Sequence, residues 1–503
     1  MESRIPQEEL NNHLWNAAVL LRTYIDAGSY KQYIFPLLFF KRLSDVYDEE
    51  TAEALEASGG DAEFAALPEN HSFAIPDGAH WCDIREATEN VGKAIVGAFR
   101  VIETANGSKL RGIFGDAAWT NKKRLPDRLL KDLIEHFSAI TLSIANCPED
   151  ELGQGYEYLI KKFADDSGHT AQEFYTNRTV VHLMTEILQP KPGESIYDPT
   201  CGSAGMLISS IAHLKQHGEE WRNVHAYGQE INQLSSAIGR MNLFLHGVED
   251  FEIANDDTLR HPAFLEAGKL RTFDMVLANP PYSIKQWDRE AFASDPYGRN
   301  FLGTPPQGRA DYAFIQHILK SMDPRSGRCA ILLPHGVLFR NEESEMRERL
   351  VRSDLVEAVI GLGANLFFNS PMEACILICR SEKAPNRSKK ILFVDASAEV
   401  TRKNAQSYLE PQHIKRIVDA YRSDEDIEGF SSHASFSELE DNAFSLSIPL
   451  YVKPANDENA DDRSIEETVE SWRAASTEAA SLLDNIAAKL HENGLIGQNV
   501  CLL

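Results

Sequence analysis

Short apolar runs alternate with helix-like stretches over residues 195–394, and this alternation most strongly constrains the fold. Parallel strands need long crossover connections, which are usually helices, so the pattern predicts a mainly parallel sheet with helices on both faces. The predicted fold class is therefore α/β, with a Rossmann-like doubly wound sheet. The expected strands are Ser195–Tyr197, Val224–Tyr227, Phe273–Leu277, Cys329–Leu333, Leu355–Ile360, Ala374–Cys379 and Ile391–Val394.

Helical periodicity dominates the sequence before residue 150. Apolar residues recur there at the spacing of one helix face, and Gly28-Ser29 interrupts the pattern. We therefore expect an all-helical N-terminal domain. The expected helices are Leu10–Tyr24, Lys31–Tyr47, Glu89–Glu103 and Leu125–Ile144, followed by Leu152–Phe163.

We expect the chain to have four parts, because 503 residues exceed what one ordinary core can bury. The tail helix, from about Ile465 to Leu490, carries an apolar stripe that packs either on a partner or back on its own chain. The parts are a helical N-terminal domain at 1–150, an α/β domain at 151–400, a C-terminal extension at 401–455, and a charged linker with a helical tail at 456–503.

The composition is that of a globular chain, with 43% hydrophobic residues and scattered cysteines that lack any metal-site spacing. The sequence shows neither a signal peptide nor a membrane-spanning run, so we expect a cytoplasmic protein with no membrane partner and no metal. The net charge of −26 opposes unaided binding to nucleic acid, which requires Lys and Arg. Such a function would need a local basic groove or a basic partner; alternatively, the acidity only aids solubility.

A glycine-rich turn, Asp198 to Gly205, follows the first predicted strand and precedes a helix that begins near Met206. Glycine lets a ligand approach the backbone closely at the carboxyl edge of a doubly wound sheet. The turn is not a complete G-x-G-x-x-G pattern, which weakens a dinucleotide interpretation. A purely structural turn remains an alternative.

Two acidic positions extend the pattern. Glu230 ends the second predicted strand, where a carboxylate can accept hydrogen bonds from both ribose hydroxyls. Asp256 and Asp257 follow a short apolar run, and a carboxylate there could accept from the amine of a cofactor adenine. Each acid alone is more often a solvated loop residue, but their order favours a nucleoside-containing cofactor.

The tetrapeptide Asn279-Pro280-Pro281-Tyr282 leaves the buried strand that ends near Leu277. An amine conjugated to a ring is a poor nucleophile, and two acceptors aimed at its hydrogens localise the lone pair. The Asn279 side-chain oxygen and the Pro280 carbonyl, held by two prolines, are suited to this task. Tyr282 offers a ring face on which an extruded base can stack. The tetrapeptide therefore favours methyl transfer to a flat, conjugated amine over a merely rigid turn.

The chain resembles the modification (M) subunit of type I restriction-modification systems, which are gamma-class N6-adenine DNA methyltransferases. The resemblance extends over nearly the whole length and implies a methyltransferase sheet of the predicted kind. It rests on Leu14-Trp15, Pro36–Asp45, Leu152-Gly153, Tyr156–Ile160, Glu173–Thr176, Asp198–Gly205, Gly228–Glu230, Asn279–Tyr282, Ala310–His317 and Leu366–Asn369.

The resemblance implies S-adenosylmethionine as the cofactor and assigns roles to individual residues. Asn279, Pro280, Pro281 and Tyr282 would be catalytic, and Phe367 or Phe368 would give a second face for a flipped adenine. Glu230 would hold the ribose. Asp257 would contact the cofactor adenine. Three residues would close over the methionine part of the cofactor: Phe174, Tyr175 and Thr176. Five residues would hold that part: Asp198, Thr200, Gly202, Ser203 and Gly205.

Three residues depart from the family pattern. Asn177 stands where proline usually follows Phe-Tyr-Thr. Ala204 replaces a common glycine, which keeps the loop tight unless a positive φ is needed. Asp256 also replaces a common glycine, which leaves open whether Asp256 or Asp257 meets the cofactor adenine.

The chain after the last predicted strand is too short for a domain that reads base edges. The resemblance therefore implies a separate specificity (S) subunit flanked by two copies of this chain on double-stranded DNA. The helix from Ile465 is the candidate contact with that subunit. Whether restriction (R) subunits join, and which DNA sequence is the target, stay open.

Four alternatives remain at this point. The same tetrapeptide serves enzymes that methylate a glutamine amide in translation release factors, although those chains lack a large helical N-terminal region. A stand-alone DNA methylase of another phage-defence system would use the same chemistry. A non-catalytic cofactor-holding scaffold and a nicotinamide oxidoreductase are more distant.

Overall fold

The computed structural model describes residues 4–166, 176–366, 373–403 and 406–453, together with 472, 473 and 477. Contacts within the chain divide it into two units, Met1–Lys453 and Pro454–Leu503. The predicted tail helix, Ile465–Leu490, lies outside the described residues except for Trp472, Arg473 and Thr477. The following description concerns the first unit.

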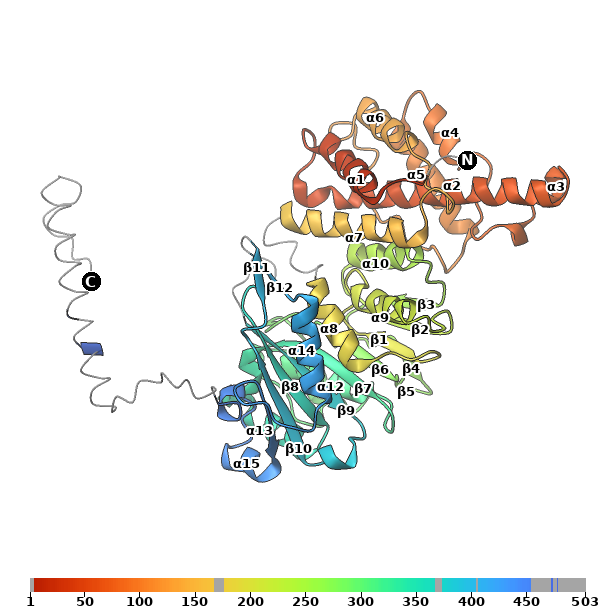
Figure 1. Cartoon of the computed structure of the whole chain (residues 1–503). Helices are drawn as coiled ribbons and strands as arrows, with labels where there is room; N and C mark the ends of the chain where they lie inside the picture. Colours follow the sequence, from red (N-terminus) through yellow and green to blue (C-terminus); the bar gives the residue numbers. More distant parts are fainter. Residues whose placement is uncertain are drawn as a thin grey trace, which may run out of the picture. The chain divides into compact units, whose positions relative to one another are not determined.

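The N-terminal part is helical, as predicted, and occupies the upper part of Figure 1. A 3₁₀ turn, Ala27–Ser29, lies at the predicted break, and the two shortest helices, α3 and α4, were not predicted because they are too short to show a period. The helices are α1 (Gln7–Leu21), α2 (Lys31–Ala57), α3 (Ala62–Ala65), α4 (Trp81–Glu86), α5 (Val91–Ala105), α6 (Asp127–Ser138) and α7 (Glu149–Asp166).

Helix α7 joins the helical part to the α/β part. Its buried residues Leu152, Tyr156 and Leu159 belong to the same core as the buried face of α2. That core also contains Ile238 and Met241 from α10 (Gln233–Leu245). Figure 1 shows α7 lying between the helical part and α10. The two parts therefore share one hydrophobic core and form a continuous body.

The α/β part contains a nine-stranded sheet in the order β13-β10-β8-β9-β7-β6-β1-β2-β3. All neighbouring pairs are parallel except those made by β9 and β13. The seven predicted strands and the mainly parallel sheet are confirmed. The strands are β1 (Ser195–Asp198), β2 (His225–Gln229), β3 (Phe251–Ala254), β6 (Met275–Ala278), β7 (Arg328–Pro334), β8 (Val356–Leu362), β9 (Ala374–Arg380), β10 (Lys390–Ala396) and β13 (Ser431–Ser435).

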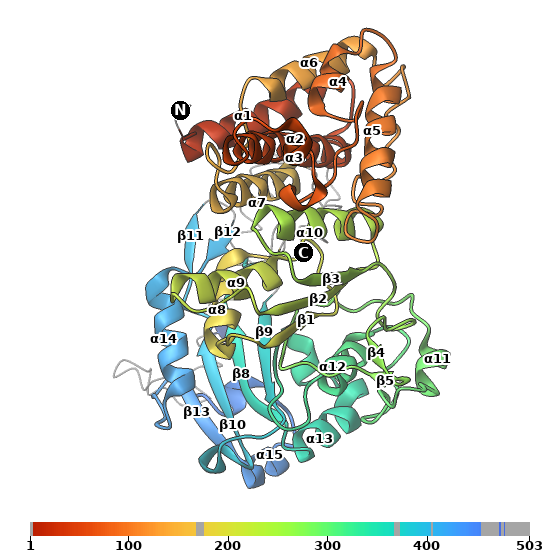
Figure 2. The same cartoon turned by 90° about the vertical axis from the view of Figure 1, so that its right-hand side faces the viewer.

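Helices cover both faces of the sheet (Figure 2), as predicted. Successive residues of a strand point to opposite faces, so Met275 and Leu277 pack in one core while Val276 and Ala278 pack in the other. The first core lies under α8 (Arg178–Leu188), α9 (Gly205–Gln216) and α14 (Pro411–Arg422); the second lies under α12 (Asp311–Lys320), α13 (Ser344–Arg352) and α15 (Phe436–Asp441).

Residues beyond 400 belong to the α/β part: β13 pairs with β10 at the edge of the sheet, and α14 packs on one face of the sheet. The sequence of β13 shows no apolar run because β13 is an edge strand of which only Ser431 and Ala434 are buried. The remaining elements are short: α11 (Arg289–Ala293) and the hairpins β4 (Leu265–Glu266)–β5 (Lys269–Leu270) and β11 (Thr401–Lys403)–β12 (Gln406–Tyr408). Among the described residues, no helix combines the length and apolarity required to cross a membrane.

Candidate active site

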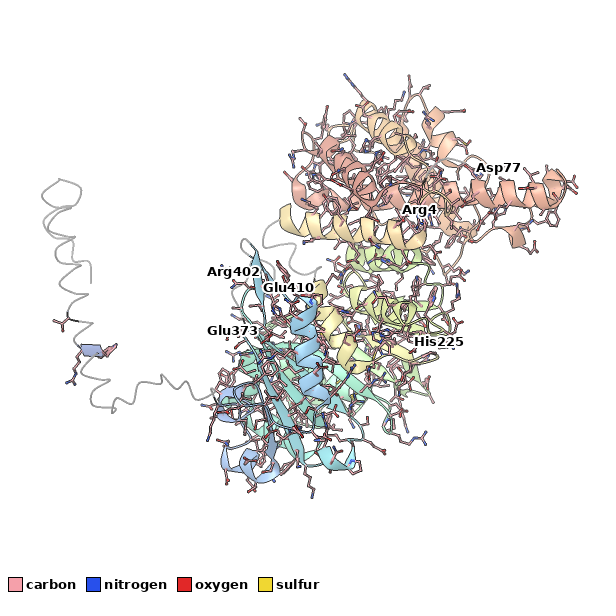
Figure 3. All side chains as sticks on the ribbon, in the orientation of Figure 1. Arg4, Asp77, His225, Glu373, Arg402 and Glu410 are labelled. Carbon is pink, nitrogen blue, oxygen red and sulfur yellow. The ribbon has the colours of Figure 1, made fainter. Side chains whose placement is uncertain are left out.

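The predicted polar residues gather at the carboxyl edge of the sheet. Asp198 is the last residue of β1, Glu230 follows β2, Asp257 follows β3 and Asn279 follows β6. The sheet order reverses between β1 and β6, and ligands of doubly wound folds bind at such a switch point. In Figure 3, His225 at the start of β2 lies on the opposite side from Glu373, Arg402 and Glu410, which lie toward the carboxyl edge.

Hydrogen bonds attach the Asp198–Gly205 turn to its neighbours. The Gly202 N–H donates to Glu230 Oε2 at 3.0 Å, and the Cys201 N–H donates to the Gln229 carbonyl at 3.0 Å. Thr258 Oγ1 donates to the Pro199 carbonyl at 2.6 Å. The turn is therefore held against the ends of β2 and β3, and two predicted cofactor residues, Gly202 and Glu230, are in direct contact.

The end of the turn is tightly packed. Ala204 adopts a left-handed φ of 62°, so the positive φ that would favour glycine is present at this position. A Cβ on Gly205 would lie 1.6 Å from Arg178 Nη1, so only glycine allows the Arg178 guanidinium to approach the start of α9. Arg178 Nη2 also lies 3.5 Å from Ser203 Oγ, and the Ser203 carbonyl accepts from Asn242 Nδ2 at 2.9 Å.

Burial determines the pKa of the Asp198 carboxyl and raises it to about 7. The Thr200 N–H donates to Asp198 Oδ1 at 2.9 Å and lowers this pKa in part. The nearby charge of Glu230 raises it further. Thr200 Oγ1 is buried beside the Asp198 carboxyl. A buried carboxylate with a buried hydroxyl beside it suits a ligand that carries an ammonium group, because both oxygens can accept hydrogen bonds from that group.

The two adjacent acids after β3 have different surroundings. Asp257 Oδ1 accepts from the backbone N–H groups of Leu259 and Arg260 at 2.9 and 3.2 Å, which fixes this half-buried carboxylate in a turn. Asp256 is exposed, and its Oδ1 accepts from the Asp257 N–H at 2.7 Å and lies 3.3 Å from His261 Nδ1. Asp257 is thus the less exposed of the two and accepts two backbone N–H groups where Asp256 accepts one.

The tetrapeptide is joined to the segment that precedes α8. Asn279 Nδ2 donates to Thr176 Oγ1 at 3.0 Å, so two residues 103 positions apart meet at the carboxyl edge. The other polar atom of the Asn279 side chain is the acceptor Oδ1. Pro280 is buried, Pro281 is exposed and Tyr282 is half-buried; burial, with smaller effects of Cys375 and Asp311, raises the pKa of Tyr282 well above 10.

Four of the predicted site residues, Phe174, Tyr175, Phe367 and Phe368, lie outside the described residues. The sequence pattern missed Arg178 and Asp311, which contact Gly205 and Ser283 respectively. Both residues occur in ordinary helical patterns, and only the tertiary arrangement shows what they touch.

Comparisons with known proteins agree with this geometry. The family model described as N-6 DNA Methylase matches residues 148–460, and the HsdM N-terminal domain model matches residues 10–137. The chain is 30% identical to the type I restriction enzyme HindI methylase subunit of Haemophilus influenzae, over 73% of this chain and 84% of that protein. It is 28% identical to the MjaIX methylase subunit of Methanocaldococcus jannaschii, over 88% and 84%.

A solved structure supports the same relationship. The crystal structure of the type I restriction-modification system methyltransferase subunit from Streptococcus thermophilus matches with a TM-score of 0.78 and 32% identity. The match covers 89% of this chain and 100% of that one. Helical and α/β parts therefore combine here as they do in that subunit.

Proposed function

Since the chain belongs to the N-6 DNA methylase family, as a methylase subunit of a type I restriction-modification system, we propose that it methylates the N6 amine of a flipped adenine in double-stranded DNA. The methyl donor would be S-adenosylmethionine. One observation carries the proposal: Asn279 of the tetrapeptide contacts Thr176, two residues before Arg178, whose guanidinium lies against Gly205 of the turn. Methyl acceptor and donor would therefore meet at one edge of the sheet.

The residues of the turn fit the proposed cofactor. Asp198 and Thr200 would accept hydrogen bonds from the methionine ammonium, and the backbone from Gly202 to Gly205 would surround the methionine part. Glu230, oriented by its bond from the Gly202 N–H, would accept from the ribose hydroxyls. Asp257 is the better candidate for the adenine amine because its carboxylate is fixed.

Arg178 is a further candidate for the cofactor. Its guanidinium lies against Gly205, where the first N–H groups of α9 have no intrahelical acceptors. Glu157 Oε2 accepts from Arg178 Nε at 2.5 Å and so orients that guanidinium. We expect Arg178 to pair with the methionine carboxylate.

The tetrapeptide would activate the adenine amine without a strong base. S-adenosylmethionine supplies a methyl group on a sulfonium, which is already a reactive electrophile. Asn279 Oδ1 and the Pro280 carbonyl would accept from the two amine hydrogens and localise the lone pair, while the Tyr282 ring would stack on the extruded base. Alignment of the reacting atoms would then supply most of the rate.

A partner subunit would select the DNA sequence that is methylated. We propose that two copies of this chain flank a specificity (S) subunit, with residues 456–503 as the contact, because the apolar stripe in the sequence from Ile465 to Leu490 needs a partner surface. The boundaries at residues 150, 400 and 455 also stay predictions.

Substitution of Asn279 tests the catalytic assignment. We expect Asn279→Ala to abolish methyl transfer to DNA while S-adenosylmethionine still binds, because the acceptor for the amine is removed and the proposed cofactor contacts of Asp198 and Glu230 remain. Transfer is measured with a labelled methyl group and binding by calorimetry. Asn106→Ala, which removes an amide in the helical part, is the matched control and should stay active. Retained N6 methylation by Asn279→Ala would refute the assignment.

A further inference from the structure

We propose that Asp311 is a positioning residue for methyl transfer, because its carboxylate fixes the backbone immediately after the tetrapeptide. The inference rests on the proposed function, since it assumes that the reaction occurs at Asn279–Tyr282. The sequence marks Asp311 only as part of a stretch, Ala310–His317, that resembles the family.

The contact between Asp311 and Ser283 is the first step of the argument. Ser283 follows Tyr282 directly and adopts a left-handed φ of 51°. Its N–H donates to Asp311 Oδ1 at 2.7 Å, and its hydroxyl donates to Oδ2 at 3.3 Å. Serine adopts this backbone conformation only where its surroundings enforce it. The Asp311 carboxylate therefore enforces the turn that sets the direction of Tyr282.

Asp311 itself is held in place by its helix. It is the first residue of α12 and is 1% exposed, and the positive end of the helix dipole stabilises its charge. Tyr312 OH donates to the Val337 carbonyl at 3.2 Å, and Gln316 Oε1 accepts from the Leu302 N–H at 2.6 Å. Residues 311–319 are all buried, so Asp311 cannot shift unless α12 shifts.

Arg340 completes the arrangement from the next strand. It follows β7, the neighbour of β6 in the sheet, and its Nη1 lies 2.8 Å from Asp311 Oδ2. A Cβ on Gly336 would come within 2.3 Å of Arg340 Nε, so glycine leaves the space that the guanidinium occupies. Arg340 Nη1 also lies 3.5 Å from the buried Glu343, whose pKa burial raises to about 7. The Asp311 carboxylate is thus held by Ser283 through hydrogen bonds and by Arg340 through an ion pair.

The carboxylate also lies within electrostatic reach of the tetrapeptide. After burial and Cys375, the charge of Asp311 contributes to raising the pKa of Tyr282. Loss of Asp311 should therefore change how Tyr282 and Asn279 face the base, with little effect on Asp198, Glu230 or the cofactor. A group with only a structural role would instead lower cofactor binding and turnover together.

Asp45 in the helical part provides a matched control. Like Asp311, it is a buried carboxylate that pairs with one cation, Lys41, and accepts from one backbone N–H, that of Leu142, at 2.6 Å. Asp45→Asn removes the same kind of pair without touching the sheet.

The test compares Asp311→Ala, Asp311→Asn and Asp45→Asn in the full chain assembled with its specificity subunit on duplex DNA. We expect Asp311→Ala to lower kcat by about 100-fold, the size of effect that a misplacement of about 1 Å produces. Asp311→Asn should lower kcat by about tenfold because Asn Oδ1 still accepts from the Ser283 N–H. The Kd for S-adenosylmethionine should change less than about twofold, and Asp45→Asn should keep its kcat.

Two results would overturn the role of Asp311. One is an unchanged kcat in either Asp311 variant; the other is a parallel loss of kcat and cofactor affinity in the Asp311 variants. If Asp311→Ala does not fold, Asp311→Asn alone decides between these outcomes. Failure of the proposed function would look different, because the wild-type assembly would then leave DNA unmethylated or Asn279→Ala would remain active.

Discussion

At the scale of single residues, the departures from the family pattern become intelligible once their neighbours are known. Asn177 caps α8 by accepting from the Thr179 N–H, and its Nδ2 donates to the carbonyls of Leu366 and Ser407. Proline could do neither. The sequence shows that Asn177 is unusual, but its partners lie 189 and 230 positions away, beyond any local pattern.

Ala204 allows a test of backbone strain. Because Ala204 has a φ of 62°, Ala204→Gly should raise the free energy of unfolding by about 1 kcal/mol, the order of the cost of a left-handed conformation for a residue with a Cβ. Urea unfolding measures the change. Ala204→Val should be less stable than wild type, and equal stability of all three proteins would show that no strain is present.

The raised pKa of Asp198 should make the proposed cofactor binding depend on pH. The carboxyl ionises as the pH rises through about 7, and only the ionised form would pair with the methionine ammonium. The affinity for S-adenosylmethionine should therefore fall more than about tenfold from pH 7.5 to pH 5.5, since each pH unit below the pKa removes about nine-tenths of the ionised form. Calorimetry at both values measures this.

Asp198→Asn is the control for that experiment. It should bind the cofactor weakly at both pH values, because it has no group that ionises in this range. A wild-type affinity that is the same at pH 5.5 and pH 7.5 would contradict the assignment of Asp198.

At the scale of elements, strongly periodic segments could be predicted and segments defined by partners could not. The seven central strands are buried on both faces and show apolar runs, whereas β13 and α14 become recognisable only against the sheet. Helix α7 was predicted by its period, but its role as a joint depends on α10 and on Arg178, which packs against Gly205. Glu157 of α7 accepts from Asn242 Nδ2 at 2.7 Å as well as from Arg178.

Glu157 tests this joint. Glu157→Gln should lower the free energy of unfolding by about 1–2 kcal/mol, because a partly buried charged hydrogen bond is lost and Arg178 is left unbalanced. The affinity for S-adenosylmethionine should also fall several-fold if Arg178 orients the methionine carboxylate. Thermal unfolding and calorimetry report the two effects. Lys161→Gln on the exposed face of α7 should change neither, and an unaltered Glu157→Gln protein would show that the joint contributes nothing.

At the scale of the whole molecule, composition was the first observation to favour the proposed assembly with other subunits. A net charge of −26 is unfavourable for an enzyme that must hold DNA alone. The sequence also predicted helical and α/β parts in the right order. It could not predict that they share one core, because the contacts of Tyr156 with α10 join residues 82 and 85 positions apart.

The division at Lys453 leads to a prediction about assembly. A chain that ends at Lys453 should keep its melting temperature and its affinity for S-adenosylmethionine, because the sheet, the two cores on its faces and the core of the helical part lie before that residue. It should fail to assemble with the specificity subunit in gel filtration. An unchanged complex would refute the assignment of residues 456–503 as the contact.

The most direct test of the central claim is to sequence the host genome for N6-methyladenine with and without this gene and its neighbours. The proposed function predicts N6-methyladenine at one defined sequence motif, lost on deletion and restored by the wild-type gene but not by Asn279→Ala. An unchanged methylation pattern after deletion, or restoration by Asn279→Ala, would contradict it.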